Sequence, residues 1–531
     1  MNEPDGGRTY TRREVLQTSL LAGAGLALAP TLLACGGDSS DSATSASPSA
    51  SAGPKKGGSL RVGTVGGSAK ETPDGQIGGE TVPNVALTHC MYDSLLTWSN
   101  DYALENLMAD EVTVNGDASV WTVRIKDGVE FHNGKTVTAD DIIWSYKRII
   151  DPKDPKTGSA NLAQLKPSGL RKIDDLTVEF TLTEPNAVFD EALGYYINCI
   201  MPQDWSAADP IGTGPFKLTE FKPGEGFKFV RNENYFGQIP WVDELAIMEF
   251  ADTTARVNAL LDGTADAISD LPSAQIKVVE AGGMKALDAK TGAWQPIYMN
   301  LKAKPFTDVR VRQAFKLIPD RQAMIEQAYA GLGSLGNDMY APFDPGYPTD
   351  IPQRTQDLEQ AKSLLKQAGY SDLTVTLVTS DAVGSGVVAA AQVYAEMAKG
   401  AGVTVKVDKV DSAIIYGDRY LSWPFSQDFW YTHNYLTQVT SASLPTSPYN
   451  ATHWADDEWS KIVNEAFRTG DVTKRNELIA QAEQIQFDND GLIIWSFNDQ
   501  VDGYSSKVGG VVPDKGGVPL SGWRLNTYYF V

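Results

Sequence analysis

The sequence contains few of the residues that build metal and redox centres. Among its 531 residues are four histidines and three cysteines. The histidines do not stand at metal-ligand spacing, and no CxxC or HExxH motif occurs. The four are His89, His132, His433 and His453. We therefore expect no metal site and no cofactor in this protein.

Catalytic motifs are also scarce. No GxSxG motif occurs, so a hydrolase nucleophile elbow has no basis in the sequence. Residues 331–336 spell GxGxxG, but they follow a helical pattern and lead into a proline-rich loop, which excludes a nucleotide-binding turn. The neighbouring acidic residues Asp140 and Asp141 do not face each other on a helix, and helix capping explains them better. We predict a protein that is not an enzyme, with a secreted hydrolase as the alternative.

Basic residues are outnumbered by acidic ones. There are 45 Lys and Arg against 67 Asp and Glu, and the net charge is −22. This balance argues against a nucleic-acid partner and favours a soluble surface. The chain is too long for one ordinary core and predicts about two or three domains. Its 42% hydrophobic content, with twelve Trp and 21 Tyr, is enough to fill them.

The amino-terminal segment predicts export. Arg12 and Arg13 precede an apolar run at residues 20–29. The alternative is a transmembrane anchor, but this apolar run is short for a span and contains small-residue breaks. Those breaks are Gly23, Gly25 and Pro30.

A cysteine follows this run directly. The order Leu32-Leu33-Ala34-Cys35 resembles a bacterial lipoprotein signal of the twin-arginine type, although Leu33 replaces the usual small residue. We predict a signal peptide over residues 1–34 and lipid attachment to Cys35. Residues 35–57, rich in Ser, Ala, Gly and Pro, predict a flexible tether.

Two cysteines remain, Cys90 and Cys199. An extracytoplasmic compartment would permit a disulfide between them. However, Cys90 lies in a helix-like run and Cys199 in an apolar, strand-like run. Two buried free thiols are therefore the expected state, and the disulfide is the alternative.

The clearest local pattern lies at residues 121–150. Trp121 to Ile125 alternates apolar and polar residues, which predicts a half-buried strand. An Asn-Gly turn follows at Asn133, and Thr138 with Asp141 predicts a capping box at the start of an amphipathic helix.

The order of predicted elements changes near residue 291. Before it, strands with antiparallel patterns dominate. After it, helices and strands alternate, and a strand at 373–378, a helix at 387–399 and a strand at 403–410 predict a parallel crossover. We predict one lobe from residues 58–290 plus 498–531, with an inserted subdomain at about 97–205. Residues 291–497 form the second lobe, so the chain crosses twice at a hinge beside a ligand cleft.

Aromatic residues gather in one stretch without a clear period, from Trp423 to Tyr435. Trp495 and Phe497 lie two residues apart on a predicted strand, Gly491 to Phe497. Core packing is the ordinary explanation for such residues. Stacking and hydrogen bonding around an extended ligand is the alternative that we favour. The predicted ligand-binding residues are Trp423, Trp430, His433, Tyr435, Trp495, Phe497 and, in the loop after the first strand, Gly67.

Several motifs stand in a characteristic order. They are Tyr92 to Leu96 (YDSLL), Lys126 to Gly134 (KDGVEFHNG), Thr138 to Asp141 (TADD), Gly212 to Leu218 (GTGPFKL), Arg231 to Gly237 (RNENYFG) and Phe306 to Ala314 (FTDVRVRQA). With these motifs, the chain from about residue 58 to its end resembles the family 5 extracellular solute-binding proteins of bacterial ATP-driven importers. The resemblance implies a two-lobed α/β fold like that of periplasmic binding proteins. It also implies a monomer that captures a small solute and delivers it to an ABC permease in the membrane.

One departure from the family pattern bears on the ligand. Peptide-binding members usually carry an acidic residue shortly after a Trp in the cleft loop, where it holds the α-amino group of the peptide. After Trp430 no carboxylate follows until Asp456, and Asp428 precedes the Trp. A sugar, a polyol or a modified peptide would suit this loop as well as a simple peptide. We expect no strong preference for free α-amino groups.

Overall fold

The computed structural model describes residues 53–66, 71–77, 81–250, 252–447 and 449–531. The predicted signal peptide, lipidation at Cys35 and ligand contact by Gly67 lie outside the described residues. Lys55, which was expected to belong to the tether, forms a bridge to Phe530 near the end of the chain. In the described residues no helix combines the length and the apolar character needed to cross a membrane.

The largest sheet has eight strands in the order β12-β19-β11-β1-β10-β9-β8, with β14 paired to β19. β1 runs parallel to both β10 and β11. The strands are β1 (Ser59–Val65), β8 (Phe216–Lys222), β9 (Gly226–Arg231), β10 (Glu244–Phe250), β11 (Ala267–Ile268), β12 (Met284–Trp294), β14 (Ser334–Leu335) and β19 (Ser496–Ser505). The helices that accompany it are α1 (Val82–Met91), α4 (Thr253–Leu261) and α5 (Ile276–Ala281).

The carboxyl-terminal tail completes the core of this sheet. Trp523 and Tyr528 are buried in one cluster with Leu60 and Val62 of β1. The tail is rich in glycine and proline, and its regular elements are short. It contains β20 (Val508–Gly509), α14 (Pro519–Gly522) and β21 (Tyr529–Phe530), and β20 pairs with β21.

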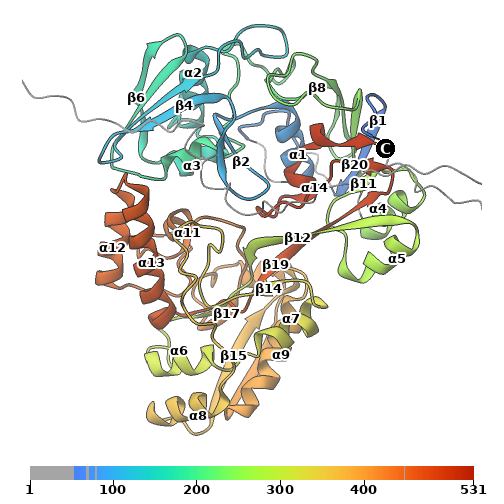
Figure 1. Cartoon of the computed structure of the whole chain (residues 1–531). Coiled ribbons are helices and arrows are strands. Elements are labelled where there is room, and N and C mark those ends of the chain that lie inside the picture. Colours follow the sequence, from blue (N-terminus) through green and yellow to red (C-terminus); the bar gives the residue numbers. More distant parts are fainter. Residues whose placement is uncertain (1–52, 67–70, 78–80, 251, 448) are drawn as a thin grey trace, which may run out of the picture.

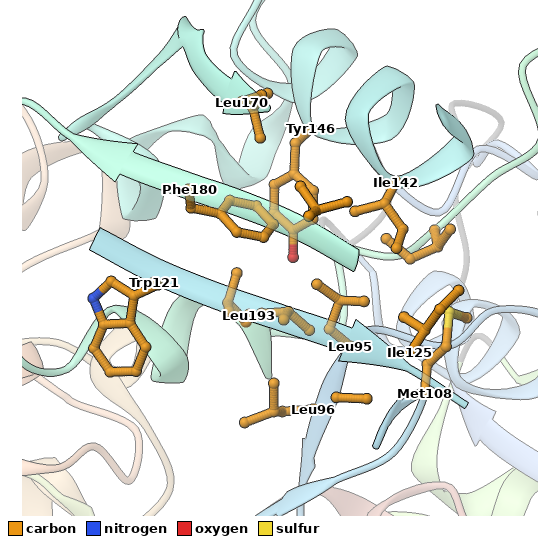
Figure 2. Close-up of a cluster of buried hydrophobic side chains, with 14 of the residues drawn as sticks. Leu95, Leu96, Met108, Trp121, Ile125, Ile142, Tyr146, Leu170, Phe180 and Leu193 are labelled. Carbon is orange, nitrogen blue, oxygen red and sulfur yellow. The ribbon is translucent and has the colours of Figure 1, made fainter. Parts of the chain in front are cut away.

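A separate antiparallel sheet has the order β4-β5-β7-β6, and α2 packs against it. The elements are β4 (Ala109–Val114), β5 (Val120–Ile125), α2 (Ala139–Ile149), β6 (Leu165–Asp174), β7 (Thr177–Leu182) and α3 (Phe189–Leu193). Figure 2 shows Trp121 and Ile125 of β5 among the buried side chains, with Tyr146 of α2 above Phe180 of β7. A short hairpin of β2 (Leu96–Trp98) and β3 (Leu104–Asn106) lies beside it.

The pattern at residues 121–150 is confirmed. The predicted strand is β5, and its inward residues Trp121 and Ile125 are buried. The capping box also forms, because Asp141 Oδ2 accepts hydrogen bonds from the backbone N–H of Thr138 (3.0 Å) and from its hydroxyl (2.8 Å).

A five-stranded sheet has the order β16-β15-β17-β13-β18. β15 and β16 are parallel and are joined through α9, so the predicted crossover is confirmed. The strands are β13 (Ile297–Met299), β15 (Leu373–Thr379), β16 (Val403–Lys409), β17 (Phe425–Gln427) and β18 (Leu492–Ile493). The helices in this part of the chain are α6 (Val309–Lys316), α7 (Arg321–Tyr329), α8 (Leu358–Gln367), α9 (Val387–Gly400), α10 (Ser412–Ile415), α11 (Tyr435–Ala442), α12 (Asp457–Phe467) and α13 (Val472–Asn489).

The two larger sheets are connected through β12 and β19, which pair antiparallel along their length. Figure 1 shows this pair running between the five-stranded sheet, at the lower end, and the remaining sheets above it. The prediction of one strand from Gly491 to Phe497 is wrong. The chain forms β18 in one sheet and β19 in the next, and Trp495 lies between them.

Cys90 and Cys199 are both free and buried, as expected. Cys90 lies on α1, but Cys199 lies in a loop and not in a strand. Burial raises the pKa of both thiols.

Candidate ligand-binding site

The candidate site is built around residues 428–434, which follow the carboxyl end of β17. β15 and β17 are parallel neighbours, and the chain leaves β15 toward α9 and β16 on its other side. The carboxyl ends of β15 and β17 are therefore a topological switch point, the position at which open α/β sheets bind ligands.

The backbone of this loop is held from several sides. The N–H of Trp430 donates to the carbonyl of Trp294 (2.8 Å), and the reverse hydrogen bond measures 3.0 Å. Thr432 accepts a bond from the Tyr102 hydroxyl at its carbonyl (2.8 Å) and from the N–H of Gly292 at Oγ1 (3.0 Å). Tyr102 belongs to the β2–β3 hairpin, whereas Gly292 and Trp294 belong to β12. The hairpin and β12 together fix the backbone of the loop and the direction of its side chains.

Exposed aromatic rings line this loop. Tyr431 is 66% exposed and Phe429 is 37% exposed, and their rings meet edge to face with centroids 5.6 Å apart. Burial raises the pKa of Tyr195 and of Tyr196, and the nearby hydroxyl of Tyr431 adds to both shifts. The electrostatic effect of the Tyr431 hydroxyl thus reaches Tyr195 and Tyr196, which come from the loop after α3.

A histidine ring extends this arrangement. His89 on α1 stacks on Tyr196 with ring centroids 4.9 Å apart. Burial lowers the pKa of His89 to about 3, so it is neutral near pH 7. We call His89, Tyr195, Tyr196, Phe429 and Tyr431 the aromatic cluster. Such rings bind a ligand by stacking, and their polar edges add hydrogen bonds.

Asp428 carries the carboxylate closest to these rings in the sequence. It is buried and accepts hydrogen bonds from the hydroxyl of Tyr420 (2.9 Å), the hydroxyl of Tyr416 (3.4 Å) and the N–H of Phe429 (3.0 Å). Burial raises the pKa of Asp428. A carboxylate has about four acceptor positions, and three are used here by the protein itself. Asp428 thus orients Phe429 and has little capacity left for a ligand.

Trp430 and His433, the two strongest predictions from sequence, are half-buried. The indole of Trp430 stacks on Trp294 with ring centroids 6.1 Å apart, and its Nε1–H donates to the Tyr298 hydroxyl. Nδ1 of His433 lies 3.0 Å from Oε1 of Gln438, and burial lowers the pKa of His433. Both residues are in the loop, but each already has protein partners.

The other predicted site residues are buried in the core. Tyr435 is the first residue of α11, and its hydroxyl lies between Gln486 and the indole N–H of Trp459. Trp423 is 8% exposed beneath the guanidinium of Arg419. Their contact with a ligand stays a prediction that this packing does not favour.

Trp495 and Phe497 do not share a face, because the expected strand is interrupted between them. Trp495 stacks on Tyr329 in the core of the five-stranded sheet. Phe497 packs in a different cluster with Trp294 and Tyr340. Neither ring is accessible in this structure.

Several residues of the site were not predicted from the sequence. Tyr195 and Tyr196 belong to the aromatic cluster, and Glu191 accepts a hydrogen bond from Asn434 Nδ2 (2.9 Å). These residues lie more than 200 positions from the loop that they meet. The only local signal for them in the sequence is a pair of adjacent tyrosines shortly after an acidic pair. This signal does not indicate that they approach the loop at residues 428–434.

A metal ion has no evident place among the described residues, since no three His, Cys, Asp or Glu side chains gather there in a suitable way. Besides the carboxyls of Asp428 and Glu191, which accept hydrogen bonds from the protein, the groups of the site are aromatic rings, hydroxyls, amides and neutral imidazoles. Together they suit reversible binding by stacking and neutral hydrogen bonds.

Comparison with known proteins identifies the family. Residues 103–460, more than half of the chain, match the bacterial extracellular solute-binding proteins, family 5 (middle region). The chain belongs to this family.

Two characterised relatives illustrate the range of the family. The chain is 29% identical over 296 residues to Heme-binding protein A of Haemophilus influenzae, and the match covers 50% of this chain and 54% of that protein. It is 24% identical over 454 residues to the Dipeptide-binding protein of Escherichia coli (strain K12), with 77% and 83% covered.

The solved structures agree on the fold. The ABC transporter substrate binding protein CtaP from Listeria monocytogenes superposes with a TM-score of 0.79 at 22% identity. The superposition covers 90% of this chain and all of that chain. The expected two-lobed α/β fold of periplasmic binding proteins is therefore confirmed.

Proposed function

We propose that this protein is an extracytoplasmic substrate-binding lipoprotein of an ABC transporter. It captures a peptide, a peptide-like solute or an oligosaccharide between two lobes and delivers it to a membrane permease. The observation that carries this proposal is the aromatic cluster, because its rings come from both sides of the boundary between the sheets. Family membership supports the transport role, and the names of the relatives above indicate peptide and heme ligands for those proteins.

The proposed lobes are residues 58–290 with 498–531, and residues 291–497. The β12–β19 pair supports a hinge between them, since the chain passes from one large sheet to the other at its end. Closure about such a hinge would bring Tyr195 and Tyr196 onto a ligand that rests on Phe429 and Tyr431.

The ligand is proposed to bind without a carboxylate–ammonium pair. Asp428 is engaged by Tyr416 and Tyr420, and the run after Trp430 (Tyr431 to His433) contains no carboxylate. Burial lowers the pKa of His433 in this run, so it is neutral near pH 7. A modified peptide or a sugar fits these groups, because both offer hydroxyls and amides for hydrogen bonds and flat faces for stacking.

The place of action is proposed from the amino-terminal segment. Export, cleavage before Cys35 and lipid attachment would hold a monomer at the outer face of the cytoplasmic membrane. Mass spectrometry of the purified mature protein tests this directly, since lipid attachment adds mass at Cys35.

The ligand itself can be identified and used to test the site. We expect native mass spectrometry to find a small molecule that copurifies with the protein. Tyr431→Ala should weaken its binding about tenfold or more, because the exposed ring loses its stacking contact, whereas melting of the empty protein should stay unchanged. Titration calorimetry measures the affinity.

The control is Ile239→Ala, at a 42% exposed position between β9 and β10 of the eight-stranded sheet. Its affinity should equal that of the wild type. Unchanged affinity in Tyr431→Ala, or turnover of the molecule by the protein, would contradict the proposed function.

A further inference from the structure

α3 and α11 meet across the boundary between the two parts of the molecule. Glu191 on α3 accepts hydrogen bonds from Asn434 Nδ2 (2.9 Å) and from the Thr437 hydroxyl, 243 and 246 positions away. Close by, Ala187 donates its N–H to the carbonyl of Phe467 (2.8 Å). Arg475 donates to the carbonyl of Ala187 (3.0 Å).

The charges around Glu191 are mostly of its own sign. Asp190 on α3 and Asp344, in the loop before α8, both disfavour its ionised form. Arg475 on α13 favours the ionised forms of these two aspartates. Burial raises the pKa of Tyr102, and the charge of Glu191 adds to that shift. Within the described part of the chain no cation forms an ion pair with Glu191, so its hydrogen-bond donors are neutral groups.

The hydrogen bonds to Glu191 carry no compensating charge. Its donors are the amide of Asn434 and the hydroxyl of Thr437, and all three residues are half-buried. A carboxylate that is partly removed from water without a paired cation is disfavoured relative to the neutral acid. This environment therefore favours a neutral Glu191 carboxyl.

We propose that Glu191 is a pH-sensitive latch between the lobes. Its protonated carboxyl holds α3 against α11, and its ionisation favours opening of the cleft. This inference rests on the hinged closure proposed above.

The direction of the effect follows from the two environments of the carboxyl. Burial in the closed form raises the pKa of Glu191 to about 8, against the opposing hydrogen bonds from Thr437 and Asn434. In an open form the side chain returns to water and to its ordinary pKa of 4.5. The closed form binds more protons between these values, so closure is favoured in acid and is lost as the pH rises toward about 8. Burial also raises the pKa of Asp190, to about 6, which acts in the same direction at lower pH.

Small-angle X-ray scattering of the ligand-free full chain tests the latch between about pH 6.5 and about pH 9, above the range of Asp190. We expect the closed-to-open ratio of the wild type to fall about tenfold or more, with a matching rise in the radius of gyration. Glu191→Gln should remain compact over this range. Glu184→Gln, an exposed control in the loop before α3, should behave like the wild type.

A second variant tests the contact itself. Thr437→Val removes the hydroxyl without changing the size of the side chain, and at about pH 6.5, where the latch holds, it should be more expanded than the wild type. The proposal is overturned if Glu191→Gln keeps the pH response of the wild type, or if the wild type does not respond. The scattering experiment contains no ligand, so its outcome does not affect the test of ligand binding with Tyr431→Ala. Failure of the latch can therefore be distinguished from failure of the proposed function.

Discussion

At the scale of single residues, neighbouring aromatic side chains have different environments. Trp430 and Tyr431 are adjacent, yet the first packs on Trp294 and the second is 66% exposed. The difference arises because the backbone bridge between Trp430 and Trp294 directs alternate side chains to opposite sides. Tyr431 is therefore the better probe of a ligand, and Trp430 is partly a structural residue.

Trp430→Ala tests this distinction. The variant loses the stack on Trp294 and the hydrogen bond to the Tyr298 hydroxyl, so we expect the free energy of unfolding to fall by about 2 kcal/mol for a half-buried indole. Urea unfolding followed by circular dichroism measures it. Tyr431→Ala is the control and should unfold like the wild type. Equal stability of both variants would show that the Trp430 indole does not support the core.

At the scale of elements, the amino terminus of α2 shows how a local signal is reinforced by packing. Asp141 completes the capping box with Thr138, and its other oxygen accepts from Lys135 Nζ (3.2 Å) and Gln203 Nε2 (3.3 Å). The side chain is fully buried, whereas that of its neighbour Asp140 is exposed. Although the two aspartates are adjacent, Asp141 should therefore contribute more to the stability of the protein than Asp140.

We expect Asp141→Ala to destabilise the protein by about 2 kcal/mol, because the N–H of Thr138 loses its acceptor and the polar groups around it are left buried. Asp140→Ala removes only an exposed ion pair with Lys172 and should cost about 1 kcal/mol or less. Thermal unfolding of both variants, monitored by circular dichroism, compares them. A larger loss for Asp140→Ala would contradict the assignment of Asp141 as the cap.

At the scale of the whole molecule, the carboxyl-terminal tail packs into the same core as strand β1. Trp523 is 2% exposed and packs in the same cluster as Leu60 and Val62. Lys55 and Phe530 form a bridge nearby. The tail is thus part of the core of the eight-stranded sheet, although its composition is that of a loop.

We therefore expect Trp523→Ala to lower the free energy of unfolding strongly. Removing a fully buried indole leaves a cavity in the core of the eight-stranded sheet, and we expect a loss of about 3 to 5 kcal/mol. Val512→Ala, at a 41% exposed position of the same tail, should change stability little. Urea unfolding followed by circular dichroism measures both. A mild effect of Trp523→Ala would mean that the tail does not support the core.

The sequence by itself determined the local structure and the family. Strand β5, the capping box of α2 and the β15–α9–β16 crossover follow from periodicity and capping, which act between residues close in the chain. The ordered motifs were sufficient to indicate the two-lobed fold. The free state of Cys90 and Cys199 was also expected from their apolar surroundings.

Only the tertiary structure decided which side chains come together at the candidate site. Glu191 meets the loop after β17 through its hydrogen bond with Asn434, 243 positions away, and Tyr195 and Tyr196 follow Glu191 in the chain. No local pattern encodes such a meeting. Trp423, Tyr435, Trp495 and Phe497 have the composition expected of a binding site, but packing buries them. Burial depends on what covers a residue, so the aromatic stretch alone could not separate Tyr431 from the core residues around it.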